Sequence, residues 1–398
     1  MRKYPETGVL LGFMAVFLGF ALAVPETFLS SNSISSILTS QAVPGIIAIG
    51  ITLLMISGEF DLSVGSIMGV SSLVFLYTAV EGIHVLIAAL FAITAGAAMG
   101  LTNGVLFITT GIPSFIITLG TMLVYRAFSL TAISGGRIVR YADYSSRNPT
   151  LDVSAWILIV CATGFCLFVA WIGHSSLRIA IRNVRNSLTF RSFLHASIWL
   201  SLYFALSSFV VATASLFSNR LFETISIDLF YILNGRILTE WIGGNYRMSI
   251  LWWLLLTGLF GVLLINTRYG NAVFATGGNA NAARAQGIDI NRVRVTNFTL
   301  SGTLAAVAGI IQAARLKSVD PLRGEGMELE VIAAVVIGGT LLKGGYGSVV
   351  GSAIGTTLTG MLRTGLVLVG IPSNAFHGAM GAIMIAAVII NSFVSRRN

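Results

Sequence analysis

Residues 43–65 read VPGIIAIGITLLMISGEFDLSVG, an apolar run from Val43 to Ser57 followed by a polar, glycine-bounded break from Gly58 to Gly65. A second apolar run, Ser63 to Val80, begins at the end of this break. Hydrocarbon cannot satisfy the backbone N–H and C=O groups that such a break frees, so the break must be buried in protein or line an aqueous cavity. The stretch therefore predicts two membrane-spanning helices joined by an enclosed polar element.

The rest of the chain has the same apolar character. Its 398 residues are 55% hydrophobic and only 10% charged, whereas soluble proteins are about 25% charged. With a mean hydropathy of +0.88, the chain has too little polar surface to coat a globular domain of this size. This composition excludes a soluble enzyme and indicates an all-α, polytopic membrane helical bundle.

Twelve apolar segments of bilayer-crossing length, some of them short or broken, follow one another along the sequence. The first follows Arg2 and Lys3 and resembles a secretory signal, but we predict that it is retained as a span. The segments are Gly8 to Val24, Val43 to Ser57, Ser63 to Val80, His84 to Ile108, Pro113 to Ile133, Ala155 to Gly173, Leu194 to Phe217, Ser249 to Ile265, Val295 to Ala314, Val331 to Leu342, Ser348 to Gly370 and Ala375 to Val394.

The basic residues suggest an orientation. With the amino terminus in the cytoplasm and strict alternation of spans, thirteen Lys and Arg residues lie inside and nine in outer loops. Two more, Arg126 and Arg363, fall within spans. Basic residues concentrate on the cytoplasmic side of membrane proteins, so the net charge of +9 is interpreted as anchoring, and we predict no nucleic-acid partner.

The longest polar segment between spans, 266–294, lies on the cytoplasmic side in this scheme and contains GGNANAARAQGI at 277–288. Asn279 or Asn281 can cap a helix there, and Gly287 can end it. We predict a short helix around which a partner protein closes, with Ile288 as an apolar anchor. A solvated loop is an equally good interpretation of the composition.

The sequence shows no motif for binding a nucleotide or a metal ion. No stretch matches the phosphate-binding pattern G-x-x-x-x-G-K-[ST], and the four histidines lack the spacing of metal ligands. Cys161 and Cys166 lie in one apolar run, which suggests neither a disulfide framework nor a metal cluster. We therefore predict no catalytic residue, metal site or resident cofactor, and if ATP supplies the energy, a partner binds it.

Glu59 and Asp61 invite two interpretations. Carboxylates within a membrane are costly and often mark a proton or ion pathway. Their i, i+2 spacing makes them diverge on a helix, which favours one capping the helix that follows and the other meeting a cation or water. Arg126 and Arg363 are the intramembrane cations available as partners.

Four separated motifs occur in order over about residues 40–140 and 230–395. They are GEFDLSVG at 58–65, TNG at 102–104 with IPSFIITLG at 112–120, the segment 267–288 around GGNANAARAQGI, and ELEVIAAVVIGGT at 328–340 with GGYGSVVG at 344–351. Together they resemble the permease subunit of bacterial ABC importers of the ribose, xylose and autoinducer-2 sugar type.

The resemblance implies a multi-pass inner-membrane protein, not an enzyme, that imports a sugar or similar small polar solute by alternating access. It also implies a cytoplasmic ABC ATPase, an external solute-binding protein, a second permease copy or paralogue, and contact with membrane lipid. The ATPase would dock on a coupling helix formed by Gly278, Asn279, Ala282, Ala283, Arg284, Gly287 and Ile288. For the translocation pathway we predict Asp61, Asn103, Ser114 and Phe115.

The middle of the chain shows no counterpart of the family's motifs. We predict an N-terminal transmembrane half at 1–144, an inserted segment with two spans at 145–227, and a C-terminal half at 228–398 that includes the coupling loop 267–294. Ten segments would then be family-like. The rival hypothesis is a stand-alone secondary transporter or channel that works without ATP and uses Glu59 and Asp61 for coupling.

Overall fold

The computed structural model describes residues 6–133, 137–143, 150–154, 160, 163–164, 224–237, 243–372, 375–376 and 378–385. The chain divides into two units, Met1–Asn148 with Phe230–Asn398, and Pro149–Leu229. In the second unit, β2 (Thr150–Ser154) pairs antiparallel with β3 (Thr224–Asp228). The predicted spans at 155–173 and 194–217 lie outside the described residues, apart from positions 160, 163 and 164, and stay predictions.

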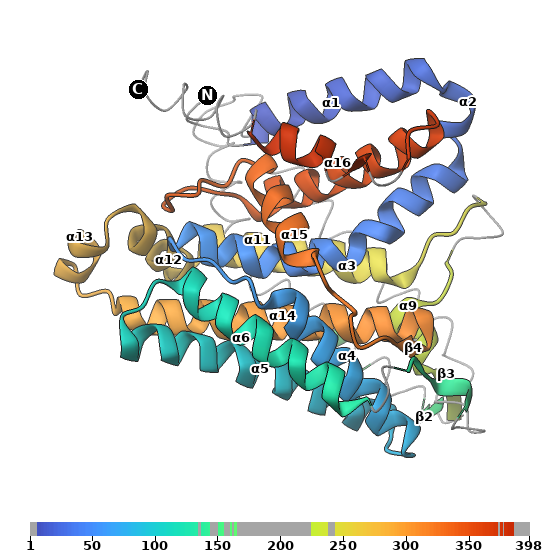
Figure 1. The fold of residues 1–398 in the computed structure, drawn as a ribbon, viewed down its shortest axis with the longest axis horizontal. Helices are drawn as coiled ribbons and strands as arrows, with labels where there is room; N and C mark the ends of the chain where they lie inside the picture. Colours follow the sequence, from blue (N-terminus) through green and yellow to red (C-terminus); the bar gives the residue numbers. More distant parts are fainter. Residues whose placement is uncertain are drawn as a thin grey trace. The chain divides into compact units, whose positions relative to one another are not determined.

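The first unit is a bundle of helices, which confirms the predicted fold class (Figure 1). Its one described strand pair is short: β1 (Val139–Arg140) runs antiparallel to β4 (Ser318–Val319), and the 3-10 turn η2 (Tyr141–Asp143) follows β1. The described helices are α1 (Glu6–Ala23), α2 (Pro25–Phe28), α3 (Ser31–Ile56), α4 (Val64–Val80), α5 (Val85–Thr110), α6 (Ser114–Ala132), α9 (Leu229–Asn234), α11 (Met248–Asn266), α12 (Arg268–Gly278), α13 (Ala280–Ala285), α14 (Ile290–Leu316), α15 (Met327–Ile337) and α16 (Val349–Leu368).

Five of the described helices are long and apolar enough to cross a membrane: α3, α5, α6, α11 and α14. Several predicted boundaries differ from those in the structure, and two of the differences have a clear local cause. Helix α3 begins at Ser31 instead of Val43, because the Ser30 side chain accepts a hydrogen bond from the backbone N–H of Ser33 and caps a polar first turn. Helix α15 ends at Ile337 instead of continuing to Leu342, because Gly339 adopts the left-handed conformation at φ +87°.

Helix α3 lies at the centre of this unit. Every residue from Gln41 to Ile56 is buried, because α3 packs against α14, α16, α11 and α15, and Figure 1 shows α3 between α16 and α14. A helix that is apolar on all sides has no face that must point to water and is typically buried. Gly50 allows a close crossing, since a Cβ there would lie 2.8 Å from the Cα of Ser301 on α14.

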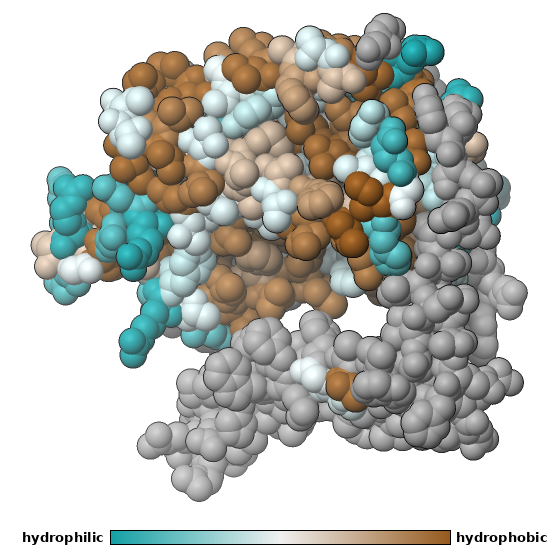
Figure 2. Space-filling view, turned by 90° about the horizontal axis from the view of Figure 1, so that it is seen from below, coloured by the Kyte–Doolittle hydropathy of each residue, from teal (hydrophilic) through white to brown (hydrophobic). Residues whose placement is uncertain are grey.

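Helices α5 and α6 lie at the periphery of the unit. Only 28% and 17% of their most apolar stretches are buried, and large apolar side chains such as Leu90 and Val124 are exposed. In Figure 2 hydrophobic residues cover much of the described surface, while hydrophilic residues gather at the end that carries α13. An apolar periphery is expected where helices face lipid, and a polar surface is expected at the end of the bundle that faces water.

Candidate functional site

Helix α13 and its flanks form the exposed polar segment that the sequence singled out. The side-chain oxygen of Asn279 caps the helix by accepting a hydrogen bond of 3.0 Å from the backbone N–H of Ala282. Gly287 then takes the left-handed conformation, at φ +80°. The structure therefore has the predicted short helix rather than a solvated loop.

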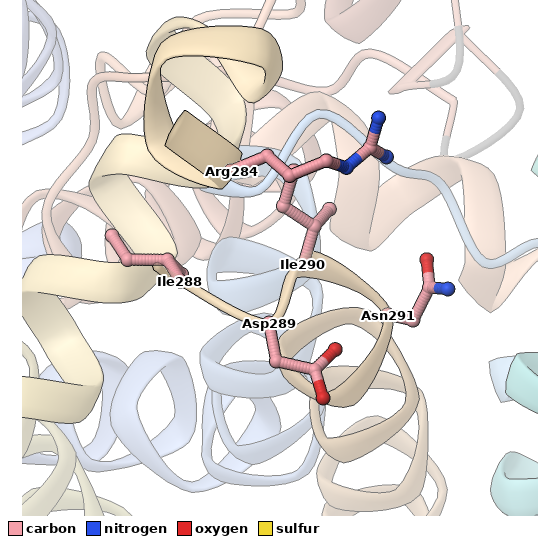
Figure 3. A pocket seen from close by; sticks show the side chains of 5 residues that line it. All are labelled: Arg284, Ile288, Asp289, Ile290 and Asn291. Atoms are coloured by element: carbon pink, nitrogen blue, oxygen red, sulfur yellow. The ribbon is translucent and has the colours of Figure 1, made fainter. Parts of the chain in front are cut away.

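The predicted coupling residues differ in exposure. Gly278, Asn279, Ala282, Arg284 and Gly287 are exposed and Ile288 is half-buried. Ala283 is only 4% exposed, so its side chain packs against the bundle and is not available to a partner in this conformation. A shallow hollow of about 140 Å³ lies beside the helix (Figure 3). Its lining residues are Arg284, Ile288, Asp289, Ile290 and Asn291.

Three glycine-rich segments meet at the C-terminal end of α3. The backbone N–H of Gly345 donates a hydrogen bond of 2.7 Å to the carbonyl oxygen of Ile56. A Cβ at Gly277 would overlap that same oxygen, and a Cβ at Gly344 would lie 2.9 Å from the Cα of Gly58. The last turn of α12 is thus in direct backbone contact with the break 343–347 and with Ile56, two residues before the break 58–65.

A polar network also joins α12 to the break through α14. The Asn297 amide donates to the hydroxyl of Ser57 at 2.9 Å and to the carbonyl oxygen of Leu53 at 3.2 Å. The hydroxyl of Tyr269, on α12, donates to the amide oxygen of Asn297. Burial raises the pKa of Tyr269, so this hydroxyl stays protonated and keeps its role as donor.

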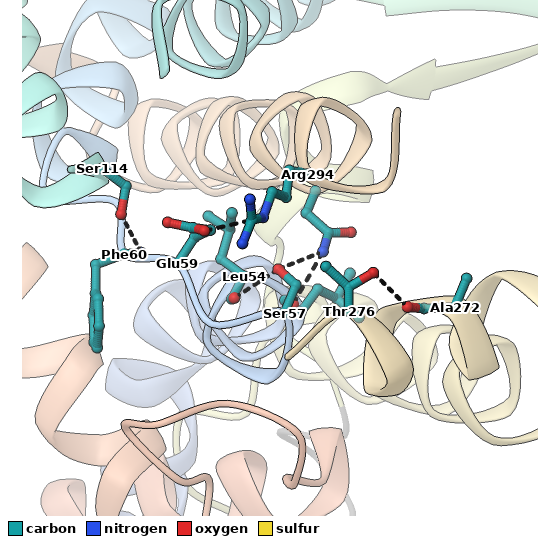
Figure 4. A network of polar contacts seen from close by, with 10 residues as sticks. Leu54, Ser57, Glu59, Phe60, Ser114, Ala272, Thr276 and Arg294 are labelled. Carbon is teal, nitrogen blue, oxygen red and sulfur yellow. Dashed lines mark hydrogen bonds and ion pairs between the residues drawn. The ribbon is translucent and has the colours of Figure 1, made fainter. Parts of the chain in front are cut away.

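Glu59 forms an ion pair with Arg294, which lies near the start of α14. Its carboxylate lies 3.0 Å from the Arg294 guanidinium, and both side chains are largely buried (Figure 4). The prediction that one carboxylate meets a cation is confirmed, but the predicted partners were wrong. Arg126 pairs instead with Glu325 and Glu328 at 3.3 and 3.6 Å, and Arg363 pairs with Glu330 at 2.7 Å.

Asp61 is completely buried and is surrounded by hydrogen-bond donors. Its Oδ1 accepts from the backbone N–H and the hydroxyl of Ser63 at 2.9 and 2.6 Å, and its Oδ2 accepts from the Ser301 hydroxyl at 3.3 Å. The Asn103 amide donates to the Ser63 hydroxyl at 2.8 Å. Within the described part of the chain Asp61 has no ion-pair partner, and this hydroxyl network links the break to α5 and α14.

The first turns of α6 satisfy the backbone of the break. The Ser114 hydroxyl accepts from the N–H of Phe60 at 3.2 Å, and the Thr118 hydroxyl accepts from the N–H of Leu62 at 3.1 Å. The freed backbone groups are therefore buried in protein, which is one of the two solutions open to a break in a membrane. Phe115 points elsewhere, with 52% of its surface exposed.

The four residues predicted for the pathway consequently do not come together as a lining. Asp61, Asn103 and Ser114 lie in the buried break and its contacts, whereas Phe115 lies outside them. Their role in translocation stays a prediction. Across the described ranges, no group of three or more His, Cys, Asp or Glu side chains is placed to hold a metal ion.

Sequence reasoning missed the three α14 side chains that hold the break: Arg294, Asn297 and Ser301. Their spacing of three and four residues places them on one face of the helix. A polar stripe of this kind in an otherwise apolar segment is a readable signal, but the predicted orientation places Arg294 in the cytoplasmic segment 266–294 and not in a span.

Comparison with known proteins gives concordant matches. Residues 33–388 match the family described as branched-chain amino acid transport system / permease component. The xylose transport system permease protein XylH of Escherichia coli K12 is 30% identical over 393 residues, which cover 98% of this chain and 92% of that protein. The ribose import permease protein RbsC of the same organism is 27% identical over 95% of this chain and 91% of its own length.

A third relative matches more closely over a shorter stretch. The probable ABC transporter permease protein YphD of Escherichia coli K12 is 44% identical over 162 residues, 40% of this chain and 49% of that protein. No solved structure matches the chain. Because the alignment with the xylose permease covers 98% of the chain, it includes 145–227, where the sequence alone had shown no counterpart of the family.

Proposed function

The chain belongs to this family of transport-system permease components, and we propose that it carries a sugar or a similar small polar solute into a bacterial cell. It is a multi-pass membrane permease of the ABC type, a transport component and not an enzyme. The observation that carries the proposal is the match over nearly the whole chain to permeases named for xylose and ribose. The family description names branched-chain amino acids, which are therefore the competing solute class.

In this proposal a partner protein binds and hydrolyses ATP. An ABC ATPase subunit would dock on α13 from the cytoplasm, with the exposed Arg284 and the hollow beside Ile288 as its contacts. A solute-binding protein would deliver the solute on the opposite side of the inner membrane, and a second permease copy or paralogue would complete the pathway. The polar end of the unit that carries α13 supports the first of these assignments.

The contacts of α12 suggest how docking would move the spans. When the ATPase subunits close, α13 would shift, and α12 would follow because Asn279 is both the end of α12 and the cap of α13. Gly277 would then press on Ile56 and on Gly345, so both breaks would move together. ATP and solute would in this way shift the populations of outward-open and inward-open states.

The contacts do not favour the rival hypothesis of a stand-alone transporter. Glu59 is neutralised by Arg294 at 3.0 Å, and Asp61 accepts hydrogen bonds from Ser63 and Ser301. A carboxylate that couples proton or ion flux needs access to water on one side in some state. In this conformation Asp61 is 0% exposed, as expected for a structural acceptor.

The test is ATP-dependent uptake by the chain reconstituted with its ATPase and binding protein. We expect Arg284→Glu to lower uptake at least about tenfold, because a reversed charge in an interface costs several kcal/mol and about 1.4 kcal/mol is a factor of ten. The matched control is Arg268→Glu, the same charge reversal at an exposed residue in the first turn of α12, which should keep normal uptake. ATP-independent flux that Asp61→Asn abolishes would instead establish the rival.

A further inference from the structure

The C-terminal end of α3 is buried, and the last four carbonyl groups of a helix need partners from outside its own ladder. The backbone N–H groups of 57–59 donate hydrogen bonds of 3.0–3.2 Å to the carbonyl oxygens of Leu53, Leu54 and Met55. The carbonyl of Ile56 accepts instead from the backbone N–H of Gly345 at 2.7 Å. Because each of these carbonyl groups has a backbone donor, further hydrogen bonds here are not needed to satisfy the helix end.

One side chain of α14 nevertheless adds two hydrogen bonds to this helix end. Asn297 is 0% exposed, and its amide donates to the Ser57 hydroxyl at 2.9 Å and to the Leu53 carbonyl at 3.2 Å. An amide nitrogen carries two hydrogens, so both are used. The Ser57 hydroxyl in turn donates to the carbonyl of Leu54 at 2.8 Å. Helix α14 thus holds the last turn of α3 through a single amide group, and the orientation of that group matters.

Tyr269 fixes this orientation. Its hydroxyl donates to the amide oxygen of Asn297 and, among the described residues, is the one partner of that oxygen. If the amide turned by 180°, its oxygen would face the carbonyl oxygen of Leu53, and two acceptors cannot bond to each other. The three side chains therefore form a relay of hydrogen bonds, Tyr269 to Asn297 to Ser57, that runs from α12 to the residue before the break 58–65.

Tyr269 must move together with α12, because it lies in the first turn of that helix. The turn is packed tightly, since a Cβ at Gly270 would overlap the carbonyl oxygen of Leu264 at the end of α11. The last turn of α12 contacts α3 directly through Gly277. Tyr269 and Gly277 are eight residues, or about 12 Å, apart along α12. Helix α12 therefore reaches the end of α3 at two separate points, so a change in its tilt is transmitted as well as a shift.

A second relay of the same residue types lies at the other end of the break. The hydroxyl of Tyr125, on α6, donates to the amide oxygen of Asn103 at 3.3 Å. The Asn103 amide donates to the Ser63 hydroxyl at 2.8 Å. The two relays differ in where they begin, since α6 packs on α4 and α5, whereas α12 leads directly into α13. The comparison separates the holding of the break, which both relays perform, from its connection to α13.

We propose that Tyr269 is a positioning residue of the transport cycle: it orients Asn297, and through Asn297 it ties the end of α3 and the start of the break 58–65 to the movement of α12. If α12 withdrew alone, the buried amide oxygen of Asn297 would lose its donor, and an unsatisfied buried acceptor is costly. Helices α12 and α14 and the end of α3 therefore move as one. This inference rests on the proposed function and names a side chain through which docking is coupled to the spans.

The first test needs no transport and measures amide hydrogen exchange of the full-length protein in detergent. Tyr269→Phe removes the hydroxyl and keeps the ring. Exchange at the amides of 57–59 should become about tenfold faster, the effect of one lost hydrogen bond on local opening, while exchange at Ser63 stays unchanged. Tyr125→Phe, the matched control, should give the reverse pattern. Unchanged exchange at 57–59 in Tyr269→Phe would overturn the proposal.

The second test measures coupling in the reconstituted transporter, as the number of ATP molecules hydrolysed per molecule of D-xylose or D-ribose imported. Tyr269→Phe should raise this ratio about tenfold, because the ATPase still docks on α13 but its closure reaches the break less often. Loss of folded protein alone would lower both rates and leave the ratio unchanged. Tyr125→Phe should keep the ratio of the unmodified protein, because its relay begins on α6.

The outcomes separate this inference from the proposed function. If the unmodified transporter shows no ATP-dependent uptake, the proposed function fails, and hydrogen exchange still decides whether Tyr269 positions the end of α3. If uptake by the unmodified protein is normal and Tyr269→Phe keeps its coupling ratio, the inference is wrong and the proposed function stands. Because Tyr269 acts through Asn297, Tyr269→Phe should add nothing to the ratio of Asn297→Ala, and an additive effect would contradict the relay.

Discussion

At the scale of single residues, the break 58–65 is held by two different kinds of contact. Glu59 is charged against Arg294, while Asp61 is held by hydroxyl and backbone donors alone. An ion pair removed from water is weak as a stabiliser, but breaking only one half of it is costly because the other charge is left unpaired. The two carboxylates should therefore respond differently to substitution.

We expect a non-additive response at the Glu59–Arg294 pair. Glu59→Gln alone leaves the guanidinium, only 24% exposed, without its counter-charge and should destabilise the protein by about 2 kcal/mol. The double variant with Arg294→Gln should recover much of that loss. Thermal unfolding in detergent measures the effect, and Arg292→Gln, at a side chain 84% exposed, is the control. Additive losses would show that the pair is not coupled.

At Asp61 we expect Asp61→Asn to be more harmful than its small change in volume suggests. An amide that replaces the carboxylate carries no charge, so the hydrogen bonds from Ser63 and Ser301 lose their charge-assisted strength. A hydrogen bond to a charged group contributes about 1.5–3 kcal/mol. Unfolding measurements on Asp61→Asn and on Ser301→Ala, which removes one donor and leaves a polar Oδ2 behind, check this. No loss in either variant would contradict the structural role.

At the scale of secondary-structure elements, the connection between α12 and the two breaks depends on glycine. The matched pair Gly277 and Gly278 shows this, since a Cβ at Gly277 would overlap the carbonyl oxygen of Ile56, whereas at Gly278 the nearest atom would be 3.9 Å away. The two positions are adjacent in sequence and belong to the same helix end. Their difference comes from packing alone.

We therefore expect Gly277→Ala and Gly278→Ala to differ in their effect on uptake. The first should force α12 away from α3 and lower ATP-dependent uptake at least about tenfold, because overpacking shifts backbones at a cost of 1–3 kcal/mol. The second leaves α12 in place, so any loss of uptake caused by its position in the predicted coupling segment should be smaller than that of Gly277→Ala. Stimulation of the partner ATPase by solute-loaded binding protein, measured beside uptake, distinguishes lost coupling from lost folding. Equal uptake by the two variants would contradict the proposed transmission.

The elements also show what a sequence can reveal. The cap at Asn279 and the left-handed Gly287 act within a few residues, so the short helix at 280–285 was predictable. The partner of Glu59 was not, because an ion pair between distant segments depends on the packing of α14 against the break. For the same reason Asp61 and Asn103, which we predict for the pathway, could be singled out from the sequence as unusual, but not recognised as a buried acceptor and a buried donor.

At the scale of the whole molecule, the glycine contacts bring the ends of α3 and α12 and the segment 343–347 to one end of the first unit. In the predicted scheme of spans, an even number of spans separates any two of these points, which places all of them on one side of the membrane. The predicted orientation places that end, with α13, in the cytoplasm. The connection between α4 and α5 at Glu81 then lies on the opposite side of the membrane.

Sidedness can be measured directly. In a background with Cys161 and Cys166 replaced by Ser, Arg284→Cys should react with a membrane-impermeant thiol reagent only in inside-out vesicles, whereas Glu81→Cys should react only in right-side-out vesicles. Both side chains are exposed, so access to the reagent does not depend on unfolding. Labelling of both positions from the same side would reverse or break the predicted topology.

The central position of α3 has a consequence for how the protein is made. This helix leaves the ribosome early, yet the helices that cover it in the finished bundle, α11, α14, α15 and α16, begin only at Met248 and beyond. Until they are synthesised, α3 has to reside in lipid or at the insertion machinery. A helix that is apolar on every side tolerates that wait. The central helix of this protein thus has a composition that suits both of its surroundings, lipid during synthesis and the other helices in the finished bundle.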